Sequence, residues 1–319
     1  MIPITLLRSH RAFGRIGTLA TVALLTACHQ APRTTLGAPV GTPPSSQMLV
    51  STAWLDSHRN DADVVVLQVG TKAQYDSGHV AGARFVALSE IAEPPVPNGL
   101  TLQMAPVPQL VAWAQANGIG DRTRVIIVPH DENLQSATRV FFTLAYLGAF
   151  DRASVVNGSF KAWKAEGRAT TTAAPAAAVP ATFTARPIPQ LIATLSQVEA
   201  VAKDSGRTAL IDARLARFYN GDGGGYPRPG HIPTAVNVPL NTVSTNGFMK
   251  PASELKTLFT AAGVRGDTPI ITYCHIGQQA TVLWFVATLL GYEARMFDGS
   301  FQEWSGTARL PVVAPPGAK

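Results

Sequence analysis

One segment of the chain reads Pro269-Ile-Ile-Thr-Tyr-Cys274-His-Ile-Gly-Gln-Gln-Ala280, and a largely apolar stretch, residues 281–291, follows it. This pattern predicts a buried strand, a short loop that contains a glycine, and then a helix. Backbone N–H groups of such a loop and the N-terminus of the helix favour an anion at Cys274. A thiolate held there is a nucleophile, and the alternative is a buried structural cysteine.

The sequence carries one pattern twice. The matched segments are residues 64–70 with 208–214, 77–83 with 229–235, and 157–163 with 298–304. Because these landmarks recur in the same order, they indicate an internal duplication.

Each half contains short Val- and Ile-rich runs without alternation, as strands buried on both faces do, and helical stretches separate them. The runs are residues 64–69, 125–128, 210–212 and 270–273. We therefore predict the α/β class, with an open, mainly parallel sheet flanked by helices in each half. Ligands bind beyond the carboxyl ends of the strands in such sheets, which is where Cys274 falls.

The N-terminus has the pattern of an export signal. Arg8, Arg11 and Arg15 precede a short apolar run, residues 16–25, and this run leads into Leu25-Thr-Ala-Cys28. Residues 1–27 resemble a bacterial lipoprotein signal peptide, which implies that Cys28 is acylated and becomes the first mature residue. The alternatives are an ordinary secretory signal and an uncleaved membrane anchor. We expect an exported protein, lipid-anchored to a membrane on the periplasmic side of the cell envelope.

Charge and cysteine content narrow the function further. Removal of residues 1–27 takes three arginines from the 26 basic residues, which leaves 23 against 20 acidic residues. No basic run with interleaved aromatic residues occurs, so we expect no nucleic-acid partner. With Cys28 acylated, Cys274 is the remaining thiol of the two cysteines, and no intramolecular disulfide can form. We expect no cofactor and no metal site.

Segments rich in Pro, Thr, Ser, Ala and Gly divide the chain. Residues 28–48 read as a flexible tether and residues 169–182 as a linker between two domains. The predicted domains are residues 49–168 and 183–310.

The repeated Gly-His pairs, the segment Leu210-Ile-Asp-Ala-Arg214, the Cys274 loop and the ending Asp298-Gly-Ser-Phe-Gln-Glu-Trp304 together resemble the tandem rhodanese family of thiosulfate and 3-mercaptopyruvate sulfurtransferases. The resemblance implies two rhodanese-like domains: an inactive first one, a catalytic second one, and an active site between them. Alignment of residues 125–137 with residues 269–280 places Pro129, His130 or Asp131 opposite Cys274, and none of these is a thiol.

The resemblance also implies roles for single residues. Cys274 would take sulfane sulfur from a small donor as a persulfide and pass it to a thiol or cyanide acceptor. Arg217 would bind the substrate, and its alternative is a solvated arginine. His79 would contact the donor, and its alternative is a histidine that fixes its own turn. We expect Asp212 and Arg214 to pair near the strand end. The residues expected to cradle the persulfide with backbone N–H groups are His275, Ile276, Gly277, Gln278, Gln279 and Ala280.

The loop also separates the candidate reactions. His275 is its one titratable group after the cysteine, and we expect it to be partly cationic near neutral pH, which favours thiosulfate over 3-mercaptopyruvate as the donor. A cysteine phosphatase needs an arginine six positions after the cysteine, where this chain has Ala280. A non-catalytic persulfide carrier or binding module is the remaining alternative.

Overall fold

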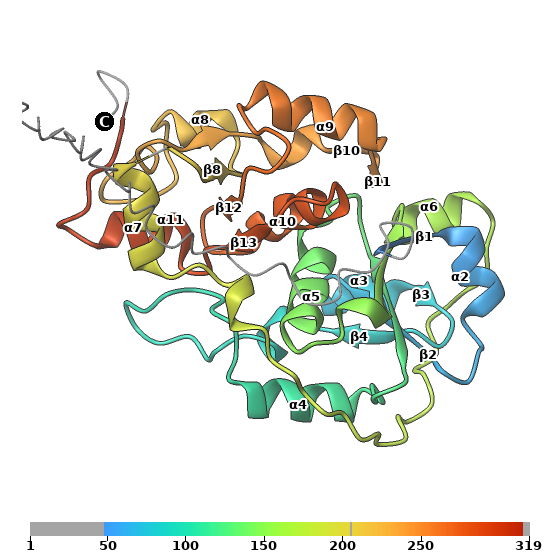
Figure 1. The fold of residues 1–319 in the computed structure, drawn as a ribbon. Helices are drawn as coiled ribbons and strands as arrows, with labels where there is room; N and C mark the ends of the chain where they lie inside the picture. The colour runs from blue at the N-terminus through green and yellow to red at the C-terminus, as the bar shows by residue number, and fades with distance from the viewer. Residues whose placement is uncertain (1–47, 205, 315–319) are drawn as a thin grey trace, which may run out of the picture. The chain divides into compact units, whose positions relative to one another are not determined.

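The computed structural model describes residues 48–204 and 206–314 (Figure 1). The predicted signal peptide, Cys28 and residues 28–47 of the predicted tether lie outside the described residues. Within these two ranges, none of the helices combines the length and the apolar character needed to cross a bilayer.

The first half of the described chain forms a five-stranded sheet in the order β1-β6-β5-β2-β4, in which all neighbours are parallel. Its strands are β1 (Leu49–Ser51), β2 (Val64–Val69), β4 (Arg84–Val86), β5 (Arg124–Pro129) and β6 (Ala153–Asn157). Successive side chains of the central strands enter different cores: Ile127 packs in one apolar cluster, and Ile126 and Val128 pack in another. The sheet is therefore buried on both faces, which explains why its strands read as continuous apolar runs.

The second half repeats this arrangement with a four-stranded parallel sheet in the order β13-β12-β8-β9. Its strands are β8 (Ala209–Asp212), β9 (Val236–Asn237), β12 (Ile270–Tyr273) and β13 (Ala294–Met296). This order matches β6-β5-β2-β4 of the first half strand for strand. The prediction of two tandem, open parallel sheets flanked by helices is thus confirmed.

Helices follow the strands in the same order in both halves. They are α2 (Thr52–His58), α3 (Lys72–Ser77), α4 (Val107–Ala116), α5 (Gln135–Tyr146) and α6 (Phe160–Ala165) in the first half, and α7 (Leu195–Lys203), α8 (Ala216–Tyr219), α9 (Ala252–Ala261), α10 (Ala280–Leu289) and α11 (Ser300–Gly306) in the second.

The halves meet through the two equivalent helices α5 and α10, which lie side by side (Figure 1). The rings of Phe142 and Trp284 meet edge to face with their centroids 4.7 Å apart, and the Thr138 and Thr281 hydroxyls share a hydrogen bond of 2.8 Å. Most side chains of both helices are buried, because each helix packs on its own sheet and on the other helix. This contact brings the first half close to the helix that follows Cys274.

The predicted linker is bound to the first half for part of its length. Thr170–Thr171 forms β7, which pairs antiparallel with β3 (His79–Val80). The carbonyl of Thr182 accepts a hydrogen bond from the N–H of Asp121. The second half contains a further small hairpin, β10 (Ser244–Thr245) with β11 (Phe248–Met249).

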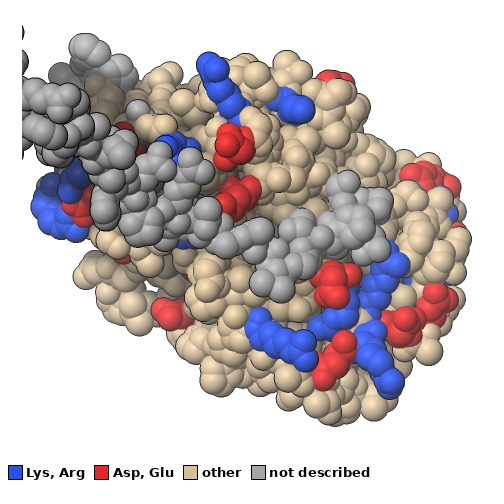
Figure 2. All heavy atoms as spheres, viewed as in Figure 1, with Lys and Arg blue, Asp and Glu red and all other residues tan. Residues whose placement is uncertain are grey.

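On the face shown in Figure 2, lysines and arginines lie among acidic side chains. Arg168 is an example of a surface pair in this protein, since it lies 2.8 Å from Asp56 and 2.6 Å from Glu166. Such surface pairs contribute little to stability, because water screens them.

Candidate active site

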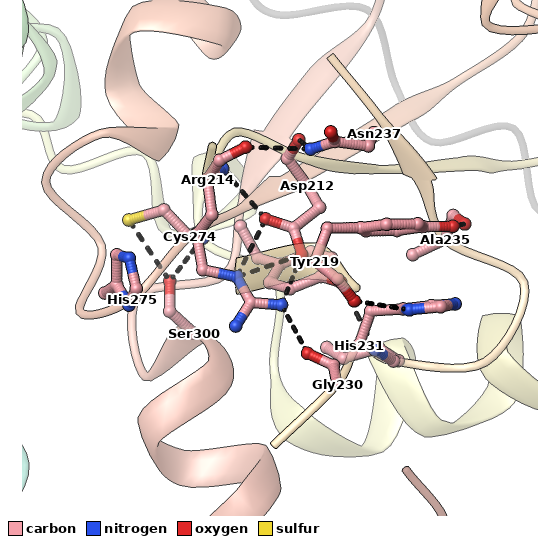
Figure 3. A network of polar contacts seen from close by, with 12 residues as sticks. Asp212, Arg214, Tyr219, Gly230, His231, Ala235, Asn237, Cys274, His275 and Ser300 are labelled. Carbon is pink, nitrogen blue, oxygen red and sulfur yellow. Dashed lines mark hydrogen bonds and ion pairs between the residues drawn. The ribbon is translucent and has the colours of Figure 1, made fainter. Parts of the chain in front are cut away.

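Cys274 directly follows β12, and its side chain is fully buried. Its backbone N–H donates to the Ser300 hydroxyl oxygen at 3.1 Å (Figure 3). That hydroxyl donates its own proton to the Phe297 carbonyl at 2.8 Å, so it cannot at the same time donate to Cys274 Sγ, 4.0 Å away. Ser300 therefore holds the backbone of the cysteine and leaves the sulfur to the loop.

The loop after Cys274 folds around the sulfur. Burial raises the pKa of the Cys274 thiol, while hydrogen bonds from the backbone of Ala280, Ile276 and Gly277 lower it, and burial has the larger effect. The resting group is therefore a protonated thiol, and the expected thiolate is not its ground state. The three donors are placed to hold the sulfur once it becomes anionic.

Gly277 is the residue that lets this loop close. Its φ is +82°, and a Cβ there would lie 2.6 Å from the Asp298 carbonyl oxygen and 2.8 Å from Asp298 Oδ1. Only glycine fits such a position without displacing backbone. The loop therefore rests directly on the segment that leads to Ser300.

Asp212 and Arg214 form a buried ion pair beside the loop, with 2.6 Å between Oδ2 and Nη2. Arg214 also donates to the Gly230 carbonyl at 2.7 Å, and its guanidinium carbon lies 4.0 Å from the ring centroid of Phe301. The predicted pairing is confirmed. Because the carboxylate neutralises the guanidinium, the pair braces the end of β8 more than it supplies positive charge to the sulfur.

His275 is neutral in this environment. Burial, reinforced by the charge of Arg214, lowers the pKa of His275 to about 4. The expectation that His275 is partly cationic near neutral pH is therefore wrong, since a buried imidazole loses the water that would stabilise its charge. No position of the loop then carries a positive charge.

Tyr226 is a site residue that sequence reasoning missed. Its hydroxyl lies 2.9 Å from His275 Nδ1 and 3.3 Å from the His275 carbonyl oxygen. Burial raises the pKa of Tyr226 to about 12, so it stays protonated. Tyr226 follows three glycines, residues 223–225. These glycines predict an irregular segment that can pass close to the Cys274 loop, and they are the sequence signal that could have pointed to Tyr226.

Arg217 stands on the short helix α8, and its side chain is exposed. Its guanidinium carbon lies 4.4 Å from the ring centroid of Phe218, and that ring meets His275 edge-on at 4.8 Å. The guanidinium makes no hydrogen bond or ion pair with any residue of the described chain, which leaves its donors available to an anion. Substrate binding by Arg217 stays a prediction.

His79 is buried in the first half. Its Nδ1 lies 2.9 Å from the Tyr75 carbonyl oxygen and its Nε2 lies 3.1 Å from that of Ala173. His231 repeats the first contact, because its Nδ1 lies 2.8 Å from the Tyr219 carbonyl oxygen. Both histidines stack on these tyrosines and fix their own turns. The contact of His79 with a donor stays a prediction.

In the first half, the residue that follows the equivalent strand β5 is His130. Its Nδ1 pairs with the Gln68 side-chain amide at 3.0 Å, and its ring packs against Phe160. The imidazole of His130, hydrogen-bonded within the first half, thus occupies the position that is equivalent to Cys274 in the second half.

A cavity of about 470 Å³ lies between the halves and touches the loop. Asn133 and Gln135 line it from the first half, and Leu215, Leu240 and Gln279 line it from the second. The buried Gln279 Oε1 has no hydrogen-bond partner in the described part of the chain. Residues 48–204 and 206–314 contain no group of three His, Cys, Asp or Glu side chains placed to hold a metal ion.

Comparisons with known proteins agree with the division into two similar domains. A family profile, "Rhodanese-like domain", matches residues 51–166 and 195–307. The chain is 30% identical over 282 residues to "Sulfur carrier protein TtuD" of Thermus thermophilus, covering 84% of this chain and 96% of that protein. It is 28% identical over 288 residues to the 3-mercaptopyruvate sulfurtransferase of Escherichia coli, covering 84% and 98%.

A solved structure shares the fold over both halves. The crystal structure of SseA from Escherichia coli superposes with a TM-score of 0.72 at 24% identity, covering 80% of this chain and 99% of SseA. At this level of identity the likeness concerns the fold.

Proposed function

Because this chain belongs to the family of proteins with rhodanese-like domains, we propose that it is a sulfurtransferase that moves sulfur from thiosulfate, or a related donor, to a thiophilic acceptor through a persulfide on Cys274. The observation that carries the proposal is the placement of one thiol at the end of β12, inside a loop whose backbone at Ile276, Gly277 and Ala280 hydrogen-bonds the sulfur.

The first half-reaction loads the sulfur. Cys274 loses its proton to the solvent, and the thiolate attacks the outer sulfur of thiosulfate. The S–S bond of the donor breaks, and sulfite leaves with the bonding electron pair. The product is a Cys274 persulfide, whose terminal sulfur carries negative charge. The loop donors are preorganised for that charge, as an oxyanion hole is for oxygen.

The second half-reaction discharges the sulfur. A thiolate or cyanide acceptor attacks the terminal sulfur, a new bond to that sulfur forms, and the Cys274 thiolate leaves. The chain has two cysteines, and Cys274 is the free one among the described residues. No resolving cysteine lies near Cys274 in the described fold, so the persulfide requires an external acceptor.

Arg217 supplies the cation that an anionic donor needs. Its exposed, unpaired guanidinium lies on α8, the helix whose Phe218 contacts His275. A planar guanidinium can donate two parallel hydrogen bonds to two oxygens of one sulfonate or carboxylate group.

3-Mercaptopyruvate is the second candidate donor, and a specific observation favours it. His275 is neutral, so the loop holds no cation for the sulfonate group of thiosulfate. A persulfide carrier is the third candidate, which the likeness to a protein named as a sulfur carrier supports.

Donor profiling tests the proposal. The protein is incubated with thiosulfate or 3-mercaptopyruvate, with cyanide as the acceptor, and sulfite, pyruvate and thiocyanate are measured over time. Steady turnover supports an enzyme and the preferred product identifies the donor, whereas a single stoichiometric transfer supports a carrier. Without acceptor, the peptide that contains Cys274 should gain the mass of one sulfur atom, and Cys274→Ser should gain none and show no turnover.

The proposal extends to location. Residues 1–28 carry a charged segment, an apolar run and a cysteine in the order of a lipoprotein signal. A lipid on Cys28 would place the protein at a membrane of the cell envelope.

A further inference from the structure

The first half contributes one buried charge to the surroundings of Cys274. Arg139 lies on α5, and 1% of its surface is exposed. A charge withdrawn from water at this depth requires an opposite charge and hydrogen-bond partners. The hydrogen-bond and ion-pair partners of Arg139 therefore show which segments of the chain this arginine fixes in place.

Two of the partners belong to the second half, and they lie in two different segments of it. Arg139 Nη1 lies 2.6 Å from Asp298 Oδ1 and 3.3 Å from the Gly277 carbonyl oxygen. Its Nη2 donates to the Leu102 carbonyl in the first half at 2.7 Å. One guanidinium thus joins the loop that follows Cys274 to the segment that precedes Ser300.

Asp298 is itself held by the first half. Its Oδ2 accepts from the Met104 N–H at 2.8 Å, and its carbonyl accepts from the Gln103 amide at 3.2 Å. Asp298 lies two residues before Ser300, whose hydroxyl accepts from the Cys274 N–H. Gly277, the other partner, is one of the residues whose backbone hydrogen-bonds the Cys274 sulfur.

We propose that Arg139 is a positioning residue for the sulfur chemistry of Cys274, acting from the half that has no thiol. It holds the Gly277 peptide against Asp298. In this way it fixes the orientation of the N–H donors that face the sulfur and the position of Ser300. This inference rests on the proposed sulfurtransferase function for its kinetic consequence.

The action is geometric. Because Asp298 neutralises the guanidinium within 2.6 Å, little net positive charge reaches the sulfur from this pair. Without the pair, the Gly277 carbonyl loses a donor and the loop is free to rotate. The backbone donors then point less well at a developing sulfur anion, which catalysis depends on more than substrate binding does.

The test uses variants of the full-length protein. Arg139→Gln leaves Asp298 buried without its partner, and this variant can lose stability for that reason alone. The double variant Arg139→Gln/Asp298→Asn removes both charges, keeps the volume of residue 298 and leaves a shorter side chain at residue 139. Arg139→Lys keeps the charge but lacks the planar guanidinium, which can donate to several partners at once. Arg152→Gln is the matched control, since Arg152 donates at 2.8 Å to a carbonyl within its own half, that of Gly120.

Three quantities are measured for each variant: the unfolding temperature, kcat and KM with thiosulfate, and the rate of Cys274 alkylation by iodoacetamide as a function of pH. The double variant should fold, lose at least about tenfold in kcat with a smaller change in KM, and alkylate with a profile displaced to higher pH. Arg139→Lys should recover part of both losses. Arg152→Gln should change the unfolding temperature alone.

A folded double variant with wild-type kcat and a wild-type alkylation profile would overturn the proposal, as would an equal loss in Arg152→Gln. If the wild type does not turn over thiosulfate, the proposed function fails in this form. The alkylation profiles still decide whether Arg139 sets the environment of the thiol.

Discussion

The Ser300 hydroxyl accepts the backbone N–H of Cys274 at 3.1 Å, so a side chain of the repeated Asn/Asp-Gly-Ser-Phe motif supports the candidate nucleophile. Its counterpart in the first half, Ser159, instead accepts from the Ala162 N–H and caps α6. Ser300 also has a φ of +51°, an unusual value for serine. The same motif thus has a local structural role in one half and holds the site in the other.

Replacement of Ser300 by Ala should lower kcat, because the buried N–H of Cys274 loses its acceptor. Leaving such a donor unpaired costs about 1–3 kcal/mol. The measurement is thiocyanate formation together with thermal unfolding. Ser159→Ala, the control, should cost about 1 kcal/mol of stability as a lost helix cap and leave kcat unchanged. Equal kcat in the wild type and a folded Ser300→Ala would contradict this role.

Gly277→Ala should damage both stability and sulfur loading. Its methyl group would meet the Asp298 carbonyl oxygen at 2.6 Å, and this contact forces the loop away from the segment that holds Ser300. Gly263→Ala separates the causes: Gly263 has a φ of +85°, but nothing lies within 4 Å of the position that its added methyl group would take, so this variant tests backbone strain without a clash. Persulfide formed per protein, by mass, should fall in the first variant and not in the second.

Arg217→Ala should raise the KM for an anionic donor, at a cost of roughly 1.5 to 3 kcal/mol in kcat/KM if a charged hydrogen bond is lost. The fold should be unaffected, because the side chain has no polar partner in the described chain. Arg309→Ala is the control, since Arg309 is exposed and pairs with Glu199 at 2.6 Å. Identical donor kinetics in the two variants would make Arg217 a solvated arginine.

Sulfur loading should increase with pH. Burial raises the pKa of the Cys274 thiol, so the reactive thiolate becomes more populated as pH rises through the ionisation of that thiol. His275, with a pKa of about 4, should add no step between pH about 5 and about 8. A pre-steady-state rate of sulfite release that falls across that interval as a histidine deprotonates would contradict the neutral His275.

Stability should fall on acidification. The pKa of His275 is lowered in the folded protein, so its contribution is present above the ordinary histidine pKa of about 6.5 and is lost as pH falls towards about 4, because the unfolded chain binds the proton first. Burial lowers the pKa of His130 and His231 as well. Urea unfolding of His275→Asn should be less sensitive to pH over this range than that of the wild type, and an unchanged slope would argue against a buried neutral His275.

Lipid attachment is a prediction of the N-terminal sequence alone. Intact-mass analysis of protein extracted from membranes should give a chain that begins at an acylated Cys28. A mature N-terminus elsewhere, or an unmodified Cys28, would remove the membrane anchor from the proposal.

Most of the fold and the central residue of the site could be predicted from sequence, because they depend on local patterns. Runs of Val and Ile predicted the buried parallel strands, and repeated landmarks predicted two similar sheets. Cys274 at a strand end and the pairing of Asp212 with Arg214 follow from neighbours a few residues apart. These features can be predicted from one half of the chain without knowing how the other half packs against it.

The surroundings of the thiol depend on tertiary structure. Tyr226, Ser300 and Arg139 lie 48, 26 and 135 residues from Cys274 along the chain, and no local pattern connects them to it. The charge of His275 was predicted wrongly for the same reason: its pKa depends on burial beneath Tyr226 and Phe218, which only the folded chain brings there. Periodicity and spacing determine which strands and loops form, whereas desolvation and long-range contacts determine how the groups on them ionise and where they point.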